Sequence, residues 1–203
     1  MAALAAAAKA PDYPAEIALV VSNRPDAGGL ARAEAEGIPT LALDHKAFAD
    51  RAAFDARLTQ ALEETGVEFV CLAGYMRLLS SGFVAHWHDR MINIHPSLLP
   101  NYKGLDTHAR ALADGARFHG CSVHFVRDDV DSGPIIAQAV VPVEAGDTPD
   151  SLATRVIIQE NQLYPHALAL VASGRARVEG ERMVFAPGVT DAKGTVLFSP
   201  PLA

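Results

Sequence analysis

The chain has 203 residues, half of them hydrophobic and a fifth charged, which is typical of a folded protein with a sizeable hydrophobic core. The formal net charge is −7 and no basic cluster is present, so binding to a nucleic-acid backbone is not expected. No apolar run approaches the roughly 18 residues that a membrane helix needs, and the Ala-rich start lacks the positive region of a signal peptide. These features together indicate a soluble, globular chain.

The first half of the chain alternates apolar, strand-like runs with helical patterns. Expected strands cover residues 15–22, 38–43 and 67–73. Expected helices cover residues 1–10, 30–36, 47–65 and 81–87. Gly37 and Gly66 end two of these helices, and Ser80 or Ser81 can cap the last one, whereas the first helix has no N-cap.

The second half has strands that follow one another with fewer helices between them. Expected strands begin at Met91 and cover residues 118–126 and 135–143, and a small hairpin covers residues 175–185. Expected helices cover residues 106–114 and 148–172, the second started by Thr148 before Pro149. The pattern predicts an α/β fold with a mostly parallel twisted sheet and antiparallel additions. It also predicts one domain over residues 1–203, with an irregular tail over residues 186–203.

Asn93 and His95 lie two residues apart in the run that begins at Met91 and stops at Pro96. On a strand, this spacing puts both side chains on one face. An amide that can donate to an oxyanion and an imidazole that can act as acid or base then project together from the strand end. The alternative is that His95 is an ordinary histidine at the end of a strand.

The acidic turn at residues 127–134 can supply a carboxylate to this pair. Asp131 precedes Ser132-Gly133-Pro134, and a Gly and a Pro together fix a tight backbone. A carboxylate beside His95 would orient the ring and favour its charged form. An ordinary turn aspartate is the alternative, which spacing alone leaves open.

Nucleotide-loop and metal chemistry find little support in the sequence. Residues 26–29, Asp-Ala-Gly-Gly, have the wrong spacing for a dinucleotide-binding loop. His119 and Cys121 face together on their strand while His124 faces away, so they form no tetrahedral metal set. The aspartates of the acidic turn lack the spacing of a calcium loop. We therefore expect no metal site.

Nucleophilic catalysis is not expected either, because no Gly-x-Ser-x-Gly elbow is present and neither cysteine has an electropositive setting. Cys71 and Cys121 lie in apolar, strand-like runs and read as buried free thiols. Two such cysteines form no disulfide framework, and they are typical of a reducing, cytoplasmic compartment.

Four separate motifs follow one another along the chain: Asn93-Ile94-His95-Pro96-Ser97-Leu98-Leu99-Pro100, Tyr102-Lys103-Gly104 with Thr107-His108, His119-Gly120-Cys121-Ser122-Val123-His124-Phe125-Val126, and Asp131-Ser132-Gly133-Pro134-Ile135-Ile136-Ala137-Gln138. Together they resemble phosphoribosylglycinamide formyltransferase, the folate-dependent enzyme of purine biosynthesis, over about residues 1–175. The resemblance implies a three-layer Rossmann-like formyltransferase fold. It also implies transfer of the formyl group of 10-formyltetrahydrofolate to the amine of glycinamide ribonucleotide.

The resemblance also implies roles for individual residues. Asn93, His95 and Asp131 match the catalytic trio, in which Asn93 and protonated His95 meet the developing oxyanion. The matching folate-binding residues are Arg51, Met76, Arg77, Leu78, Leu79, Asn93, Arg127, Asp128, Asp129, Val130 and Asp131. The ribonucleotide-binding residues are Ile157, Ile158, Gln159 and Glu160, where Glu160 pairs with the substrate amine. The alternatives are plain core for Leu78 and Leu79 and a solvated helix position for Glu160.

One departure from the family concerns the start of the chain. Family members begin with a strand and a Gly-rich loop that binds the substrate phosphate at a helix N-terminus. Met1 falls where the first helix has already begun, so we expect the first strand and the phosphate loop to be missing and ribonucleotide binding to be weak.

Three competing functions follow from the same motifs. A formyltetrahydrofolate deformylase carries an N-terminal regulatory domain, and methionyl-tRNA formyltransferase carries a C-terminal RNA-binding domain and a basic surface, for which we see no match. A non-catalytic folate-binding protein is the third. We expect small-molecule substrates only, no nucleic-acid or membrane partner, and either a monomer or a homodimer.

Overall fold

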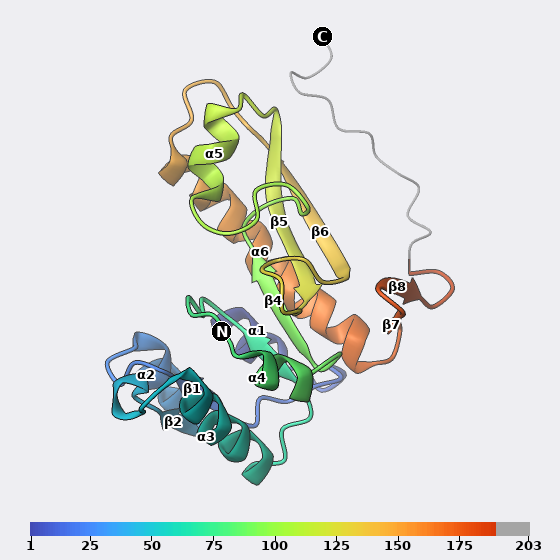
Figure 1. The fold of residues 1–203 in the computed structure, drawn as a ribbon. Helices are drawn as coiled ribbons and strands as arrows, with labels where there is room; N and C mark the ends of the chain where they lie inside the picture. The colour runs from blue at the N-terminus through green and yellow to red at the C-terminus, as the bar shows by residue number, and fades with distance from the viewer. Residues whose placement is uncertain (190–203) are drawn as a thin grey trace. The chain divides into compact units, whose positions relative to one another are not determined.

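The computed structural model describes residues 1–189. The chain forms two compact units, one over Met1–Ile92 and one that begins at Asn93 (Figure 1). The chain passes from the first unit to the second within strand β4 (Met91–His95). Of the predicted tail, residues 186–189 lie in neither a helix nor a strand, and residues 190–203 lie outside the described part of the chain. One domain over residues 1–203 stays a prediction.

The first unit contains the predicted alternation of helices and short strands. Its helices are α1 (Ala2–Ala7), α2 (Gly28–Ala35), the 3-10 helix η1 (His45–Ala47), α3 (Arg51–Glu64) and α4 (Ser81–His86). Its strands are β1 (Val20–Ser22), β2 (Thr40–Ala42) and β3 (Val70–Leu72). β1 and β2 pair in parallel, with Val21 opposite Leu41. Each strand is shorter than predicted, because ladder pairing covers only part of each apolar run.

Local capping sets the helix boundaries of the first unit. The Asp50 carboxylate accepts a hydrogen bond from the Ala53 amide at 2.8 Å, so the helix predicted over residues 47–65 starts at Arg51 and is preceded by η1. Ser80 is the N-cap of α4, as its hydroxyl accepts from the Phe83 amide at 3.3 Å. Gly66, with a φ of 67°, ends α3 as predicted.

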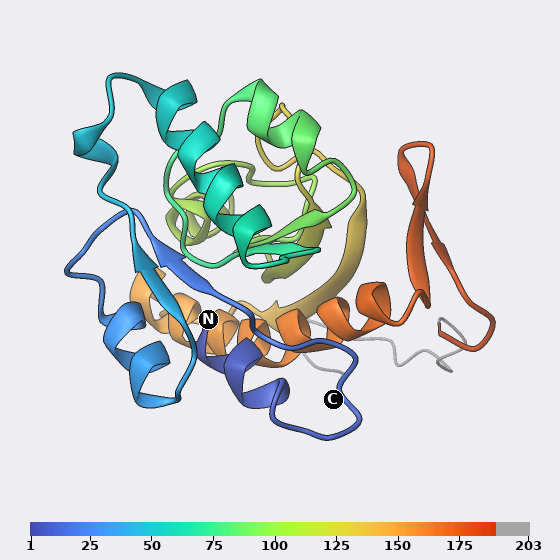
Figure 2. The ribbon, with the colours of Figure 1, turned by 90° about the horizontal axis from the view of Figure 1, so that it is seen from below.

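The second unit contains the long strands and the longest helix. Its elements are the end of β4, α5 (Thr107–Ala113), β5 (Phe118–Phe125), β6 (Ile135–Pro142), α6 (Pro149–Ala172), β7 (Ala176–Glu179) and β8 (Arg182–Phe185). The sheet runs in the order β3-β4-β5-β6, and β5 and β6 are antiparallel. β7 and β8 form the predicted hairpin, which follows α6 in Figure 2. The mostly parallel sheet with antiparallel additions is thus confirmed.

Helix α6 covers one face of the β5–β6 pair (Figure 1). Thr148 caps it: its hydroxyl accepts from the Ser151 amide at 3.2 Å, while the Ser151 hydroxyl accepts from the Thr148 amide. A buried cluster joins the helix to the strands and consists of Cys121, Val141, Val143, Leu152 and Val156. Within residues 1–189, no helix combines the length and the apolar character needed to cross a membrane.

We expect Leu152→Ala to lower the free energy of unfolding by about 2–5 kcal/mol, because it removes a fully buried side chain from this cluster and leaves a cavity. The matched control is Ile157→Ala, on the same helix, where the side chain is 53% exposed and the loss should be about 0.5 kcal/mol. Urea unfolding followed by circular dichroism compares both variants with the parent chain. Equal losses would contradict this packing.

Candidate active site

His95 lies at the end of β4 between two hydrogen-bond acceptors. Its Nδ1 is 3.2 Å from Oδ2 of Asp131, and its Nε2 is 2.9 Å from the carbonyl oxygen of Tyr102. A neutral imidazole has one N–H and can satisfy only one acceptor, whereas the imidazolium has two and satisfies both. The side chains are only 7% and 10% exposed, so solvent offers little alternative. His95 is therefore held between a carboxylate and a carbonyl oxygen, both of which accept hydrogen bonds.

Asp131 receives contacts from three segments of the second unit. Besides His95, its Oδ2 accepts from the Gly104 amide at 2.9 Å, and its Oδ1 lies 3.5 Å from Nε2 of His124. Burial raises the pKa of Asp131, but the hydrogen bonds from His124 and Gly104 and the charges of His95 and His124 together hold it below its ordinary value. The carboxylate is thus held ionised.

The turn that carries Asp131 is tightly folded against the end of β5. Asp131 has a φ of 51°, a left-handed conformation that is rare for a residue with a side chain. A Cβ on Gly133 would lie 1.9 Å from the Phe125 carbonyl oxygen, so no other residue fits there. The Phe125 amide donates to the Pro134 carbonyl at 2.9 Å. The predicted tight turn is confirmed, and it directs Asp131 toward His95.

Alternate positions of β5 all contact the β4 segment and the loop that follows it. A Cβ on Gly120 would lie 3.0 Å from Leu98 Cδ2 and 1.9 Å from the Ala139 carbonyl oxygen, so the missing side chain lets this loop approach the strand. Four positions further along, the Nε2 of His124 is 3.5 Å from the Asn93 amide nitrogen. Asn93 and Asp131 thus have His124 as a common neighbour.

Ser122, between these two positions, uses its full hydrogen-bonding capacity, and two of its three hydrogen bonds go to the same loop. Its hydroxyl donates to the Ser97 carbonyl at 2.7 Å and accepts from the Leu99 amide at 3.0 Å and from Gln138 at 2.8 Å. One donor and two acceptor positions are all that a hydroxyl offers. Ser97 and Ser122 are fully buried, and this network fixes the Pro96–Pro100 loop directly after His95.

The sequence patterns brought Asn93, His95 and Asp131 forward but gave His124 no place in the site. In the sequence, His124 is a candidate only as a metal ligand, and its spacing does not support that role. Its position two residues after Ser122 and four after Gly120 was the available signal, because alternate residues of a strand share a face. The contributions of the Tyr102 carbonyl and the Gly104 amide come from backbone atoms and leave no side-chain signal. Within residues 1–189, no group of three or more metal-binding side chains occurs.

The predicted folate-binding residues are divided between the units. In the first unit, Met76 is 76% and Leu78 59% exposed on the segment after β3, so plain core is wrong for Leu78, while Leu79 is half-buried. Arg77 stacks 5.8 Å from the Phe54 ring centroid, and Arg51 is the first residue of α3.

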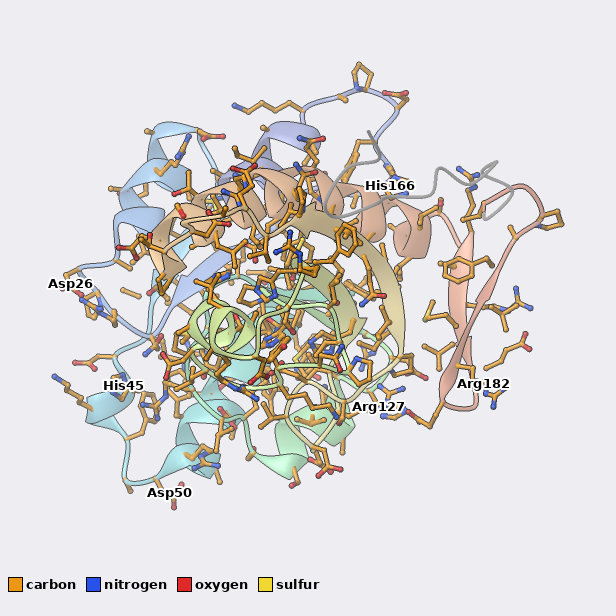
Figure 3. All side chains as sticks on the ribbon, turned by 90° about the horizontal axis from the view of Figure 1, so that it is seen from above. Asp26, His45, Asp50, Arg127, His166 and Arg182 are labelled. Carbon is orange, nitrogen blue, oxygen red and sulfur yellow. The ribbon has the colours of Figure 1, made fainter. Side chains whose placement is uncertain are left out.

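In the second unit, Asp128, Asp129 and Val130 are exposed on the acidic turn. Arg127 begins this turn, and its Nε donates to Glu181 at 3.0 Å, which places it beside the β7–β8 hairpin in Figure 3. Asp131, the last of the predicted folate-binding residues, lies on the same turn and contacts His95.

The predicted ribonucleotide-binding residues lie on α6. Ile157 and Ile158 are 53% and 51% exposed, unusual for such large apolar side chains on a helix, and Gln159 is half-buried. Glu160 is half-buried, and burial raises its pKa. Among residues 1–189, no hydrogen bond or ion pair engages its carboxylate. Glu160 is therefore not the solvated helix glutamate that composition alone suggests.

The fold and the site together define a class. The fold is a mixed α/β fold in which one sheet strand ends with the amide of Asn93 and the imidazole of His95. The buried carboxylate of Asp131 contacts this imidazole. The sequence pattern of the formyl transferase family matches residues 1–168, and the chain belongs to that family.

Similar proteins with known names include formyltransferases and a multifunctional protein of purine biosynthesis. The chain is 48% identical to phosphoribosylglycinamide formyltransferase of Escherichia coli (strain K12) over 78% of this chain and 75% of that protein. It is 48% identical to the trifunctional purine biosynthetic protein adenosine-3 of Bos taurus over 87% of this chain, but spans only 17% of that protein. The crystal structure of glycinamide ribonucleotide transformylase 1 from Symbiobacterium toebii shares 44% identity and a TM-score of 0.87, with 90% and 86% of the two chains covered.

Two further histidines form a neutral pair near the site. His108 Nδ1 lies 3.1 Å from His119 Nε2. Burial, followed by repulsion from His108 and His95, lowers the pKa of His119 to about 4, and burial followed by repulsion from His95 lowers the pKa of His108. The unfolded chain therefore binds a proton at His119 that the folded chain does not, between about pH 6.5 and pH 4.

We expect stability to fall as the pH decreases through this window, with His119 contributing a slope of up to about 1.4 kcal/mol per pH unit. His119→Gln should reduce this slope. His166→Gln is the matched control, because the His166 ring is exposed on α6. Urea unfolding at a series of pH values measures the slope, and an unchanged slope in His119→Gln would contradict the assignment.

Proposed function

We propose that this chain transfers the formyl group of 10-formyltetrahydrofolate to the amine of glycinamide ribonucleotide, giving formylglycinamide ribonucleotide and tetrahydrofolate in de novo purine biosynthesis. The observation that carries the proposal is the His95–Asp131 pair, with Nδ1 and Oδ2 3.2 Å apart, in which His95 shares strand β4 with Asn93. The identity of 48% to the Escherichia coli phosphoribosylglycinamide formyltransferase supports the choice of substrates.

Formyl transfer needs a group that stabilises negative charge on the formyl oxygen. The substrate amine attacks the formyl carbon, a carbon–nitrogen bond forms, and the carbonyl electrons move to oxygen. The Asn93 amide and the His95 imidazolium each donate an N–H to this oxyanion. Removing one such donor typically costs about 100-fold to 1000-fold in rate. For Nε2 of His95 to donate, the oxyanion has to replace the Tyr102 carbonyl as its acceptor.

The second half of the reaction needs proton transfer. The attacking amine loses a proton, N10 of the folate gains one, and the bond between N10 and the formyl carbon breaks. Asp131 is held ionised beside His95 and serves as the base that passes this proton through water. No step requires a metal.

Substrate binding is assigned to two groups of residues. Glu160 carries a carboxylate that can pair with the substrate amine before attack, and its partial burial strengthens such a pair. In the first unit, Met76 and Leu78 offer exposed apolar surface for the flat pteridine. Val130 is an exposed apolar member of the folate set in the second unit. The remaining folate contacts are assigned to Arg51, Arg77, Leu79, Arg127, Asp128 and Asp129, and the remaining ribonucleotide contacts to Ile157, Ile158 and Gln159.

We further propose that the protein acts in the cytoplasm, in one-carbon metabolism. Cys71 and Cys121 form no disulfide, which suits a reducing compartment. Burial, followed by the neighbouring Glu160 carboxylate, raises the pKa of Cys121 to about 12, so this thiol stays protonated and unreactive.

The direct test supplies 10-formyltetrahydrofolate and glycinamide ribonucleotide and measures formylated ribonucleotide and free formate. Formylated product without excess formate supports the proposal. Formate release that does not depend on the ribonucleotide would instead indicate a hydrolase. Binding of a folate analogue without either product would indicate a folate-binding protein.

We expect His95→Ala and Asp131→Asn each to lower kcat by about 100-fold or more, because each removes a member of the charged pair. Folate binding, measured by fluorescence titration with a folate analogue, should change little. His88→Ala is the matched control, since His88 is exposed and pairs only with Asp89 among described residues. Near-parental turnover in both site variants would refute the catalytic assignment.

We expect Glu160→Gln to raise the KM for glycinamide ribonucleotide by about 10-fold to 100-fold, because a charged hydrogen bond typically contributes about 1.5–3 kcal/mol. The KM for the folate should stay constant. Glu179→Gln, on the exposed β7–β8 hairpin, is the control. An unchanged ribonucleotide KM in Glu160→Gln would remove Glu160 from the binding site.

A further inference from the structure

The loop between Asn101 and Asp106 adopts a backbone that its own sequence does not favour. Tyr102, Gly104 and Asp106 have φ values of 54°, 79° and 56°, all in the left-handed region. Left-handed backbone costs residues with a side chain roughly 1–2 kcal/mol each. Contacts with the rest of the second unit therefore have to hold this loop in place.

Arg110, on the exposed side of α5, makes several of these contacts. Its Nη1 donates to the Lys103 carbonyl at 2.7 Å and lies 3.3 Å from the Leu105 carbonyl. Its guanidinium carbon is 5.6 Å from the Tyr102 ring centroid, within the range of a cation–π contact. The Tyr102 ring also meets the His119 ring in an edge-on arrangement, with centroids 6.0 Å apart.

The Lys103 carbonyl and the Gly104 amide belong to the same peptide group. Arg110 binds the oxygen end of this peptide, and the nitrogen end donates to Oδ2 of Asp131 at 2.9 Å. The positive guanidinium thus contacts the negative end of the peptide dipole, and the negative carboxylate contacts its positive end. Such chains strengthen one another, because a cation on the carbonyl polarises the N–H toward its acceptor.

We propose that Arg110 is a positioning residue that acts on Asp131 through the Lys103–Gly104 peptide and so holds Asp131 against His95. The catalytic consequence of this inference rests on the proposed formyl transfer, whereas the contacts between Arg110, the peptide and Asp131 do not depend on it. The Asp131 carboxylate faces His95 from β4, His124 from β5 and the Gly104 amide from the loop. Arg110 therefore supports one of the three contacts of this carboxylate, the one with the Gly104 amide. Removing Arg110 weakens that hydrogen bond and leaves the contacts with His95 and His124 in place.

The arrangement also explains why a peptide group suits this role. The preceding peptide, which carries the Tyr102 carbonyl, lies outside the contacts that run from Arg110 through Lys103 and Gly104 to Asp131. The Gly104 hydrogen bond is among the contacts that lower the pKa of Asp131, after burial has raised it. Loss of Arg110 should therefore move the titration of Asp131 to higher pH.

The test compares the parent chain with Arg110→Ala, Arg110→Lys and the control Arg177→Ala, which removes an arginine from the β7–β8 hairpin. Three quantities are measured: hydrogen exchange of the Gly104 amide, the NMR titration of the Asp131 carboxylate, and the pH profile of kcat. A net hydrogen-bond contribution of about 0.5–1.5 kcal/mol corresponds to about 2–10-fold effects on exchange and on kcat.

We expect Arg110→Ala to exchange the Gly104 amide about 2–10-fold faster and to raise the titration midpoint of Asp131 and the acidic limb of the kcat profile. Both KM values should stay unchanged, and the unfolding temperature should fall by only about 2–4 °C, because the lost contacts stabilise a single loop. Arg110→Lys should give intermediate values, because a lysine keeps the charge and one donor group. Arg177→Ala should match the parent chain.

Parental exchange and titration in Arg110→Ala would overturn the proposal, and an Arg110→Lys variant no better than Arg110→Ala would overturn the role of the cation. A change in Arg177→Ala as large as that in Arg110→Ala would also overturn it, since any lost arginine would then suffice. Exchange and titration need no turnover. If the parent chain transfers no formyl group, the proposed function fails while these two readouts still decide the role of Arg110.

Discussion

The carboxylate of Asp131 is the point on which the second unit converges. His95 from β4, His124 from β5 and the Gly104 amide all meet it, and the side chain is only 10% exposed. A charge removed from water is tolerated only when its neighbours replace the lost solvation. The three contacts do so here, and each one constrains a different segment. The same contacts that make Asp131 stable as an anion therefore also fix the positions of the residues around it.

β5 is the scaffold for this convergence. Because Gly120 has no side chain, Leu98 can pack against the strand. Ser122 forms hydrogen bonds with the backbone on both sides of Leu98. His124 contacts Asn93 and Asp131. One strand thus positions the loop after His95 and also the carboxylate opposite it. α6 packs on the same pair of strands and places Glu160 near Cys121, so the core that stabilises the unit also sets the surroundings of the second carboxylate.

Burial has opposite consequences for the titratable groups of this unit. Asp131 is buried as a charge because His95, His124 and the Gly104 amide surround its carboxylate. His108 and His119, which face each other without a carboxylate, are kept neutral instead. Glu160 lies between these cases: partial burial disfavours its charge, and no described partner compensates. Such a carboxylate gains more from binding a cationic amine than a solvated one does.

The sequence by itself determined the order and type of the elements, the family, and the pairing of Asn93 with His95. These follow from local signals: apolar periodicity, the caps at Ser80 and Thr148, and the alternation of side chains along a strand. Only the tertiary structure decided the places of His124 and Arg110 and the use of the Tyr102 carbonyl and the Gly104 amide. Backbone atoms carry no residue-specific signal, and which strand and loop lie beside Asp131 depends on long-range packing rather than on neighbouring letters.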